Sequence, residues 1–152
     1  MLCDLEIRRA DLADMSDVVS LCSKHAAHER VDYDPTCKRE ALTTAIFEPP
    51  SKLVCLVASL RNTLVGYTTC IPQYSTWSAA EYLYMDCLYV ESSWRGLGIG
   101  KRLMHAVAEE AKTFGYSEIQ WQTPDFNVEA VRFYDAVNGT SRLSKLRFTW
   151  QL

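Results

Sequence analysis

A strand, a glycine-rich turn and an amphipathic helix follow one another over residues 84–114, and this succession limits the possible folds more than any other segment. Residues 84–90 form an apolar run rich in Tyr, Leu and Val, which is typical of a buried strand. The residues that recur at helical spacing after the turn are Leu103, Val107, Ala111 and Phe114. We therefore expect a helix that begins at the turn and packs this apolar face against the sheet.

The turn at residues 95–100 suits an anion, because the first N–H groups of a helix lack helical partners and the helix dipole is positive there. A P-loop would need Gly at Arg95 and Ser or Thr at Arg102. A dinucleotide fingerprint fails because Leu103 or Lys101 occupies its third glycine position. We expect a phosphate group at this turn, although the six residues alone also fit an ordinary glycine-rich turn.

The remaining motif, R-x-x-G-x-G at residues 95–100, resembles the pyrophosphate-binding signature of the GCN5-related N-acetyltransferases. Residues 127–134 resemble that family's N-x-x-A-x-x-F-Y segment in order and in spacing. The resemblance implies acetyl-CoA as the cofactor, bound by both segments and by the strand before the turn. The residues so implied are Leu88, Tyr89, Val90, Arg95, Gly96, Leu97, Gly98, Ile99, Gly100, Lys101, Asn127, Ala130, Phe133 and Tyr134.

Acetyl transfer needs a base and an acid, and the resemblance implies both. A free alkylammonium titrates at about pH 10, so it must lose a proton before it attacks a thioester. We expect Asp86 to be the base, directly or through a water, with Glu81 and Glu29 as alternatives. Tyr134 is the acid expected to protonate the departing thiolate. Strand alternation would direct Cys87 away from Asp86, which argues against an acetyl-cysteine intermediate.

The order of predicted elements favours an α/β fold. We expect strands at 5–8, 52–60, 64–71, 84–90 and 118–123, and a closing pair at 141–143 and 147–150. Helices are expected after Asp11, at 37–47, after the glycine turn and from Asn127. Residues 72–80 are expected to form a loop. The chain is thus predicted to be one domain, residues 1–152, with a mixed, mostly antiparallel sheet flanked by helices, the acetyl-CoA N-acyltransferase fold.

Composition narrows the partners and the location. The net charge of −3, with no basic cluster, argues against nucleic acid as the main partner. No apolar run approaches the roughly 20 residues of a membrane helix, and the first residues lack a basic region followed by an apolar one. We therefore expect a cytoplasmic protein that does not associate with membranes.

Metal and disulfide chemistry are not expected. The six cysteines include no C-x-x-C pair, and Cys55, Cys70 and Cys87 lie in apolar strand-like runs that favour buried, reduced thiols. His25 and His28 stand three residues apart with only Glu29 beside them, which favours a solvated helix end over a metal site.

The acceptor is expected to be a small cationic amine. Within the family the chain is most similar to the diamine (spermidine/spermine) acetyltransferases, through residues 74–77, 83–86 and the Arg95 turn, although it carries Asp86 where those enzymes tend to carry Glu. Polyamines, a diamino acid, an aminoglycoside, a xenobiotic amine and a peptide N-terminus all stay open. The candidate acceptor residues are Glu29, Asp32, Tyr33, Trp77 and Glu81.

Two further hypotheses concern activity and assembly. The first alternative to an enzyme is a non-catalytic acyl-CoA-binding or regulatory module that keeps the cofactor turn. Retention of both Asp86 and Tyr134 argues against it. The aromatic C-terminal segment at 148–150 is expected to support a homodimer, and Trp77 with Tyr74 could pack such an interface or stack on the acceptor.

Overall fold

The computed structural model describes residues 4–137, 139–140 and 146–152. Contacts between residues divide the chain into two compact units, Met1–Gln122 and Thr123–Leu152. The first unit contains every strand of the described sheet, and the second contains the last helix. The elements are β1 (Leu5–Arg9), η1 (Leu12–Asp14), α1 (Met15–His28), α2 (Lys38–Phe47), β2 (Val54–Leu60), β3 (Thr63–Ser75), β4 (Ala80–Val90), η2 (Ser92–Trp94), α3 (Ile99–Thr113), β5 (Ile119–Trp121) and α4 (Val128–Ala136).

The sheet is mixed and mostly antiparallel, as predicted. Among the described residues its order is β1-β2-β3-β4-β5, and only the β4–β5 pair is parallel. β5 pairs with β4 over Leu83–Met85 alone. The edge of β4 that follows Met85 therefore carries no strand from the described part of the chain, and its backbone groups are available there to a ligand.

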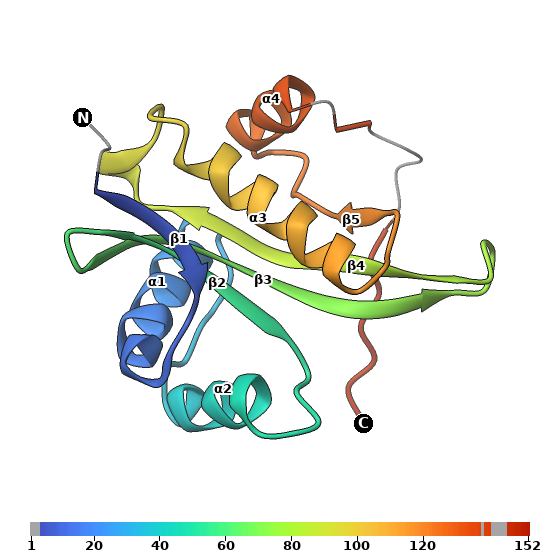
Figure 1. Ribbon diagram of the computed structural model, residues 1–152, viewed down its shortest axis with the longest axis horizontal. Helices are drawn as coiled ribbons and strands as arrows, with labels where there is room; N and C mark the ends of the chain where they lie inside the picture. Colours follow the sequence, from blue (N-terminus) through green and yellow to red (C-terminus); the bar gives the residue numbers. More distant parts are fainter. Residues whose placement is uncertain (1–3, 138, 141–145) are drawn as a thin grey trace. The chain divides into compact units, whose positions relative to one another are not determined.

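Helices cover both faces of the sheet in the first unit (Figure 1). On one face α1 and α2 pack over a cluster that includes Val18, Val57 and Tyr67. On the other face α3 contributes Ile99 and Leu103 to a cluster with residues of β2 and β3. These apolar stripes recur at helical spacing, and burying them against the sheet is what holds the helices in place. No helix of the described residues has the length and apolar character needed to cross a membrane.

Local sequence accounts for the start of α1 and for the first hairpin. The Asp11 side chain accepts hydrogen bonds from Ala13 and Asp14 backbone N–H groups and so caps the short helical turn before α1. β2 and β3 are joined by Arg61 and Asn62, which both have positive φ angles, of 50° and 62°. Two successive positive φ angles are the signature of a hairpin turn that matches the twist of the strands. The predicted hairpin is confirmed.

Three expectations about elements were wrong, and one lies outside the described residues. Residues 72–80 are mostly not a loop, since β3 continues to Ser75 and β4 begins at Ala80. Residues 147–150 form no strand. Phe114 does not extend the buried face of α3, because it caps the helix end, is 40% exposed and stacks on Tyr116. The predicted strand at 141–143 falls among residues that the structure does not describe.

Candidate active site

The glycine turn forms an open cradle at the start of α3. Gly98 is the residue before the helix, with a φ angle of +79°, and Gly96 has a φ angle of +75°, both in the region that favours glycine. A Cβ atom added to either glycine would meet no atom within 4 Å, so the surface above them is open. The first helical hydrogen bond runs from Arg102 N–H to the Gly98 carbonyl at 3.1 Å. The N–H groups of residues 99–101 precede it and lack helical acceptors, as an anion site requires.

Arg95 links this turn to β4. Its Nε donates a hydrogen bond to the Val90 carbonyl at 2.9 Å, and its guanidinium lies 5.5 Å from the centroid of the Tyr89 ring. A cation over an aromatic face is attracted by the ring quadrupole. The Val90 carbonyl therefore already accepts a bond from Arg95, and Arg95 helps to hold the turn against the end of β4. The open surface over Gly96 and Gly98, together with the N–H groups of residues 99–101, fits a diphosphate group.

A β-bulge in β4 determines where Asp86 points. Thr69 pairs with Cys87 and Cys70 pairs with Met85, so Asp86 is the extra residue on β4. A bulge interrupts the regular alternation of side chains and redirects the residue that it inserts. Asp86 and Cys87 consequently line the same pocket, and the Cys87 Sγ atom lies 3.8 Å from the Asp86 Oδ2 atom. The expectation that alternation directs them to opposite faces was wrong.

The pocket beside Asp86, called here the Asp86 pocket, lies between α1, α2 and the sheet. Its volume is about 210 Å³. The walls are mainly apolar, and Asp86 and Lys38 are the acidic and basic side chains among its lining residues. The lining residues are Val18, Cys22, Tyr33, Lys38, Leu42, Ile46, Leu53, Tyr67, Thr69, Asp86 and Cys87. Such a pocket suits a slender molecule with an aliphatic stem and a charged end.

Burial keeps the protons on the thiols and phenols of the Asp86 pocket. It raises the pKa of the Cys87 thiol to about 12, and the nearby Asp86 carboxylate adds to this shift. It likewise raises the pKa of Cys22 and Tyr67, and it raises that of Tyr33 to about 12. The Tyr33 hydroxyl is buried beside the Cys22 thiol, and no hydrogen bond of ordinary geometry reaches it from the described residues. It is a polar group that a bound molecule could satisfy.

His25 is buried, and the expectation of a solvated helix end was wrong for it. Only 9% of the residue is exposed, its Nδ1 atom lies 3.0 Å from the Tyr67 hydroxyl and its Nε2 atom lies 3.2 Å from a Glu29 carboxylate oxygen. Burial lowers the pKa of His25, against the opposing effect of Glu29. His28 is exposed, as expected. Within the described ranges, no three His, Cys, Asp or Glu side chains gather as they would around a metal ion.

Of the predicted acceptor residues, Tyr33 lines the Asp86 pocket and the other four do not. Glu29 instead contacts His25. Glu81 pairs with Tyr74 in the β3–β4 hairpin and interacts with the Tyr116 hydroxyl. Trp77, at the tip of that hairpin, is fully exposed, and Asp32 is exposed in the connection from α1 to α2. The structure brings together Asp86 and Tyr33 but neither Glu81 nor Trp77.

The second unit holds the remaining predicted cofactor residues. Asn127 precedes α4 and its Oδ1 atom accepts a hydrogen bond from the Ala130 N–H at 3.2 Å, so Asn127 holds the helix start. The rings of Phe133 and Tyr134 meet edge to face, with centroids 5.2 Å apart. The contacts of this unit with the cofactor stay predictions.

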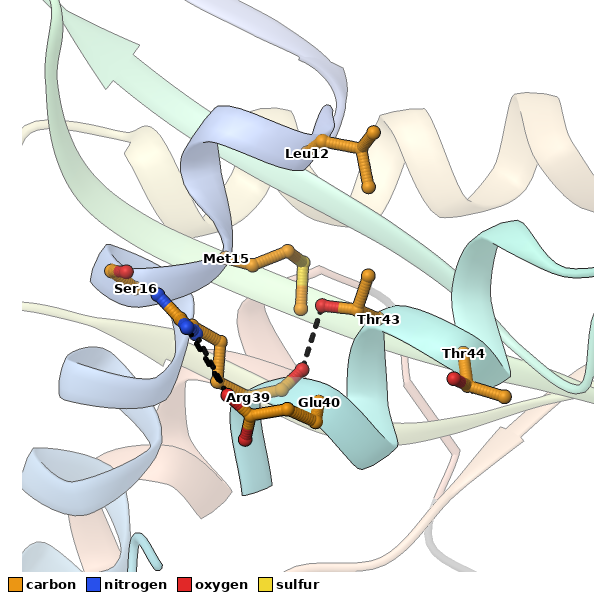
Figure 2. Close-up of a pocket in the computed structure, with 7 residues that line it drawn as sticks. All are labelled: Leu12, Met15, Ser16, Arg39, Glu40, Thr43 and Thr44. Atoms are coloured by element: carbon orange, nitrogen blue, oxygen red, sulfur yellow. Dashed lines mark hydrogen bonds and ion pairs between the residues drawn. The ribbon is translucent and has the colours of Figure 1, made fainter. Parts of the chain in front are cut away.

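A second hollow, of about 380 Å³, lies between the start of α1 and α2. Figure 2 shows Leu12, Met15 and Ser16 on one side of it and α2 side chains on the other. Three of its lining residues already interact with one another. Arg39 forms an ion pair with Glu40, and the Thr43 hydroxyl donates a hydrogen bond to the Arg39 carbonyl. It contains none of the residues that the sequence indicated for catalysis.

Sequence reasoning missed Tyr67, Thr69, His25 and Lys38. One signal was available for His25, because it follows Leu21 by four positions and Val18 by seven and so continues the buried stripe of α1. The pocket positions of Tyr67 and Thr69 depend on the pairing of β3 with β4, which no local pattern gives.

Comparison with known proteins decides the family. The family description "Acetyltransferase (GNAT) family" matches residues 18–139. The chain belongs to the GNAT acetyltransferase family. This confirms the resemblance drawn from the glycine turn and the Asn127 segment, and it identifies the chain as an N-acetyltransferase. Members of this family use acetyl-CoA in general.

Relatives and solved structures agree with this assignment. The chain is 30% identical over 139 residues to a thialysine N-epsilon-acetyltransferase of Bos taurus. That alignment covers 86% of this chain and 81% of the relative. It is 29% identical over 105 residues to an L-ornithine N5-acetyltransferase of Arabidopsis thaliana, covering 68% of this chain and 46% of that one. An aminoglycoside acetyltransferase from a soil metagenome has a TM-score of 0.82 at 23% identity, with 98% and 97% coverage, which supports the fold.

Proposed function

We propose that this GNAT acetyltransferase transfers acetyl from acetyl-CoA to the primary amine of a small cationic acceptor by direct attack in a ternary complex. The observation that carries the proposal is the Asp86 pocket, in which one carboxylate stands at the bulge of β4 beside an open strand edge. A carboxylate there would attract the ammonium group of the acceptor and could take up its proton.

A diamino acid is the acceptor that the pocket favours. Its volume of about 210 Å³ is below the roughly 300–1,000 Å³ of pockets for drug-sized ligands, which argues against an aminoglycoside or a peptide. Asp86 would attract the amine that is acetylated, and Lys38 would attract a carboxylate while repelling the second ammonium of a polyamine. The names of the relatives, which act on thialysine and ornithine, agree with this choice.

Asp86 is the base in this proposal, and the alternatives have other partners. Glu29 lies against His25, and Glu81 interacts with Tyr116 in the β3–β4 hairpin. Glu81 precedes Asp86 by five positions, which corresponds to roughly 16 Å along a strand. A base must come within hydrogen-bond reach of the proton that it takes, and Asp86 is the carboxylate that lines the pocket.

The glycine turn and the edge of β4 would hold the cofactor. The N–H groups that precede the first helical hydrogen bond of α3 would bind the diphosphate, next to Gly96 and Gly98. Backbone groups of Leu88 and Val90 would position the thioester, with the Val90 N–H as the donor because Arg95 already bonds the carbonyl. Acetyl-CoA, when bound, supplies the thioester carbonyl that the amine attacks.

Tyr134 is the proposed acid for the departing thiolate. A phenol retains its proton at neutral pH and can donate it to sulfur when held within hydrogen-bond reach. Cys87 is an unsuitable nucleophile, because burial and Asp86 raise the pKa of its thiol to about 12. Direct attack by the amine therefore has better support than an acetyl-cysteine intermediate.

A homodimer is the proposed assembly. Trp77 and Tyr74 in the β3–β4 hairpin are exposed, and so are Phe148 and Trp150 near the C-terminus. Large exposed apolar side chains are enriched at interfaces between protein chains. Light scattering coupled to size-exclusion chromatography would report a mass near twice 17.3 kDa if the proposal holds.

CoA release from acetyl-CoA tests the function directly. The wild-type protein would be assayed with lysine-like diamino acids, ornithine, spermidine, an aminoglycoside and a peptide, with acetyl-CoA binding followed by calorimetry. We expect turnover on diamino acids and a selective loss of it, relative to spermidine, in Lys38→Glu. Binding of acetyl-CoA without turnover on any amine would favour the non-catalytic module, and preference for spermidine would overturn the role of Lys38.

A further inference from the structure

Tyr89 is the second-to-last residue of β4, and its ring contacts side chains from two other parts of the first unit. The residue is 8% exposed and belongs to the same buried cluster as Tyr67, its pairing partner on β3. The His25 ring of α1 stacks on Tyr89, with centroids 5.2 Å apart and 25° between the rings. The Arg95 guanidinium lies over the Tyr89 ring, 5.5 Å from its centroid. One buried ring thus contacts both α1 and the first residue of the glycine turn.

His25 holds the Tyr89 ring in place from the α1 side. Both nitrogens of the imidazole have partners, the Tyr67 hydroxyl 3.0 Å from Nδ1 and a Glu29 carboxylate oxygen 3.2 Å from Nε2. The imidazole is therefore fixed in one orientation, and stacking on it restricts the Tyr89 ring in turn. Burial lowers the pKa of His25, so the imidazole is neutral at neutral pH and places no second positive charge beside Arg95.

Arg95 has two contacts at the end of β4, one polar and one aromatic. Its Nε donates to the Val90 carbonyl at 2.9 Å, and its guanidinium is attracted by the quadrupole of the Tyr89 ring. A long arginine side chain otherwise samples many rotamers, and fixing one of them costs conformational entropy. Contacts that fix the side chain before a ligand arrives reduce the entropy that binding would lose. The Tyr89 ring therefore preorganises Arg95.

We propose that Tyr89 is a positioning residue for the cofactor, which acts through Arg95 to hold the glycine turn in the conformation that binds the diphosphate of acetyl-CoA. The proposal rests on the cofactor site proposed above, and it gives the Tyr89 ring a role that needs no contact with the cofactor. Arg95 directly precedes Gly96, so an Arg95 held on Tyr89 fixes the chain where the cradle begins. The Arg95 charge also adds to the positive potential of the N–H groups of residues 99–101.

A small set of variants separates the aromatic ring from the bulk of the side chain. Tyr89→Phe keeps the ring, whereas Tyr89→Leu keeps an apolar side chain without a π face. Arg95→Gln removes the positive charge and keeps an N–H donor. Tyr82→Leu is the matched control on β4, because Tyr82 precedes Tyr89 by seven positions and bonds Gln73 in the β3–β4 hairpin. Val57→Ala, from the same buried cluster as Tyr89, controls for loosening of the core.

Calorimetric titration with acetyl-CoA gives the dissociation constant of each variant without an acceptor amine, and thermal unfolding identifies the variants that have folded. If Tyr89→Leu does not fold, Tyr89→Met takes its place, because a flexible methionine adapts to the space. We expect Tyr89→Leu and Arg95→Gln each to weaken binding about tenfold, as for a partly desolvated cation–π contact. The double variant should bind no more weakly than Arg95→Gln, because both changes remove one shared interaction. Tyr89→Phe, Tyr82→Leu and Val57→Ala should keep wild-type affinity.

A donor without a diphosphate distinguishes positioning of the turn from general damage to the site. Acetyl-pantetheine carries the same thioester on the pantetheine arm but has no diphosphate. With an amine that the wild-type protein turns over, Tyr89→Leu should raise the KM for acetyl-CoA about tenfold and keep kcat. Its kcat/KM for acetyl-pantetheine should equal that of the wild-type protein. A merely structural role would lower the rates with both donors.

Failure of this proposal and failure of the proposed function have different signatures. If wild-type protein and Tyr89→Leu bind acetyl-CoA equally well, the role of Tyr89 is overturned and the function stands. A double variant about tenfold weaker than Arg95→Gln would show that the two residues act independently, which also overturns the proposal. If wild-type protein binds acetyl-CoA but releases no CoA with any amine, the function fails, and calorimetry still decides the role of Tyr89. If wild-type protein does not bind acetyl-CoA, both fail together.

Discussion

Asp86 and Cys87 are consecutive residues of β4, yet both side chains line one pocket, with Cys87 Sγ 3.8 Å from Asp86 Oδ2. A regular strand would direct them to opposite faces of the sheet. The pairing of β3 with β4 skips Asp86, so the bulge turns one carboxylate into a pocket that is otherwise mainly apolar. The backbone irregularity therefore gives the site its negative charge.

Asp86→Asn should lower kcat/KM for the amine by about 10²–10⁴-fold, because the amide has nearly the shape of the carboxylate but cannot take up a proton. The acidic limb of the pH profile should flatten. The measurement is initial rate against acceptor concentration across pH. Glu81→Gln is the matched control and should keep the wild-type profile. An unchanged limb in Asp86→Asn, together with an altered one in Glu81→Gln, would assign the base to Glu81.

Gly98→Leu should abolish acetyl-CoA binding, because a side chain at this positive φ would project into the open cradle that precedes α3. Gly115→Leu is a matched control, since Gly115 also has a positive φ, of 78°, and open space around it, but lies after the end of α3. Both variants should cost about 1–2 kcal/mol of stability through backbone strain. Calorimetric titration with acetyl-CoA distinguishes them, and equal affinity in both would argue against the cradle as the diphosphate site.

Much of the fold around the glycine turn could be predicted from local signals. The apolar strand, the Gly96 and Gly98 spacing and the stripe of α3 lie within one continuous segment, so each constrains the next. The extent of the β3–β4 hairpin could not be predicted in this way. Polar residues such as Gln73 and Ser75 look like a loop in sequence, but pairing with β4 satisfies their backbone groups and extends the strand.

The candidate site was predictable in its residue types and less so in its geometry. The resemblance predicts Asp86 as the base, and that role stays a prediction; the orientation of Asp86 depends on a bulge that only cross-strand register creates. His25 was assigned to a solvated helix end because its spacing to His28 makes a poor metal site, whereas Tyr67 and Glu29 supply the partners that permit its burial. Partners that are 42 positions apart, as His25 and Tyr67 are, leave no local signature.

Leu103→Ala should lower the free energy of unfolding by about 2–5 kcal/mol, because Leu103 is fully buried against the sheet and its loss leaves a cavity. Phe114→Ala removes a larger side chain from the C-terminal end of the same helix, but that side chain is 40% exposed and stacks on Tyr116 at the surface. It should cost no more than about 1 kcal/mol. Urea unfolding of the two variants at one pH compares them, and a similar loss in both would show that Phe114 belongs to the core after all.

His25 should make stability depend on pH below about 6.5. Burial lowers its pKa in the folded state, whereas the unfolded chain binds a proton at the ordinary pKa of 6.5. Stability is therefore fully present above the unfolded pKa and is lost as pH falls from that value through the folded pKa. The Asp14 carboxyl, whose pKa its bond with Arg8 lowers from 3.8, contributes a loss only at more acidic pH.

His25→Gln should remove this dependence, because glutamine does not titrate. Urea unfolding at pH 7.5 and at pH 5.5 gives the change in unfolding free energy for each protein, and it should be smaller in His25→Gln than in wild type. His105→Gln is the matched control and should keep the wild-type change, since His105 is an exposed side chain on α3. If all three proteins lose the same stability between the two pH values, folding does not lower the pKa of the buried imidazole.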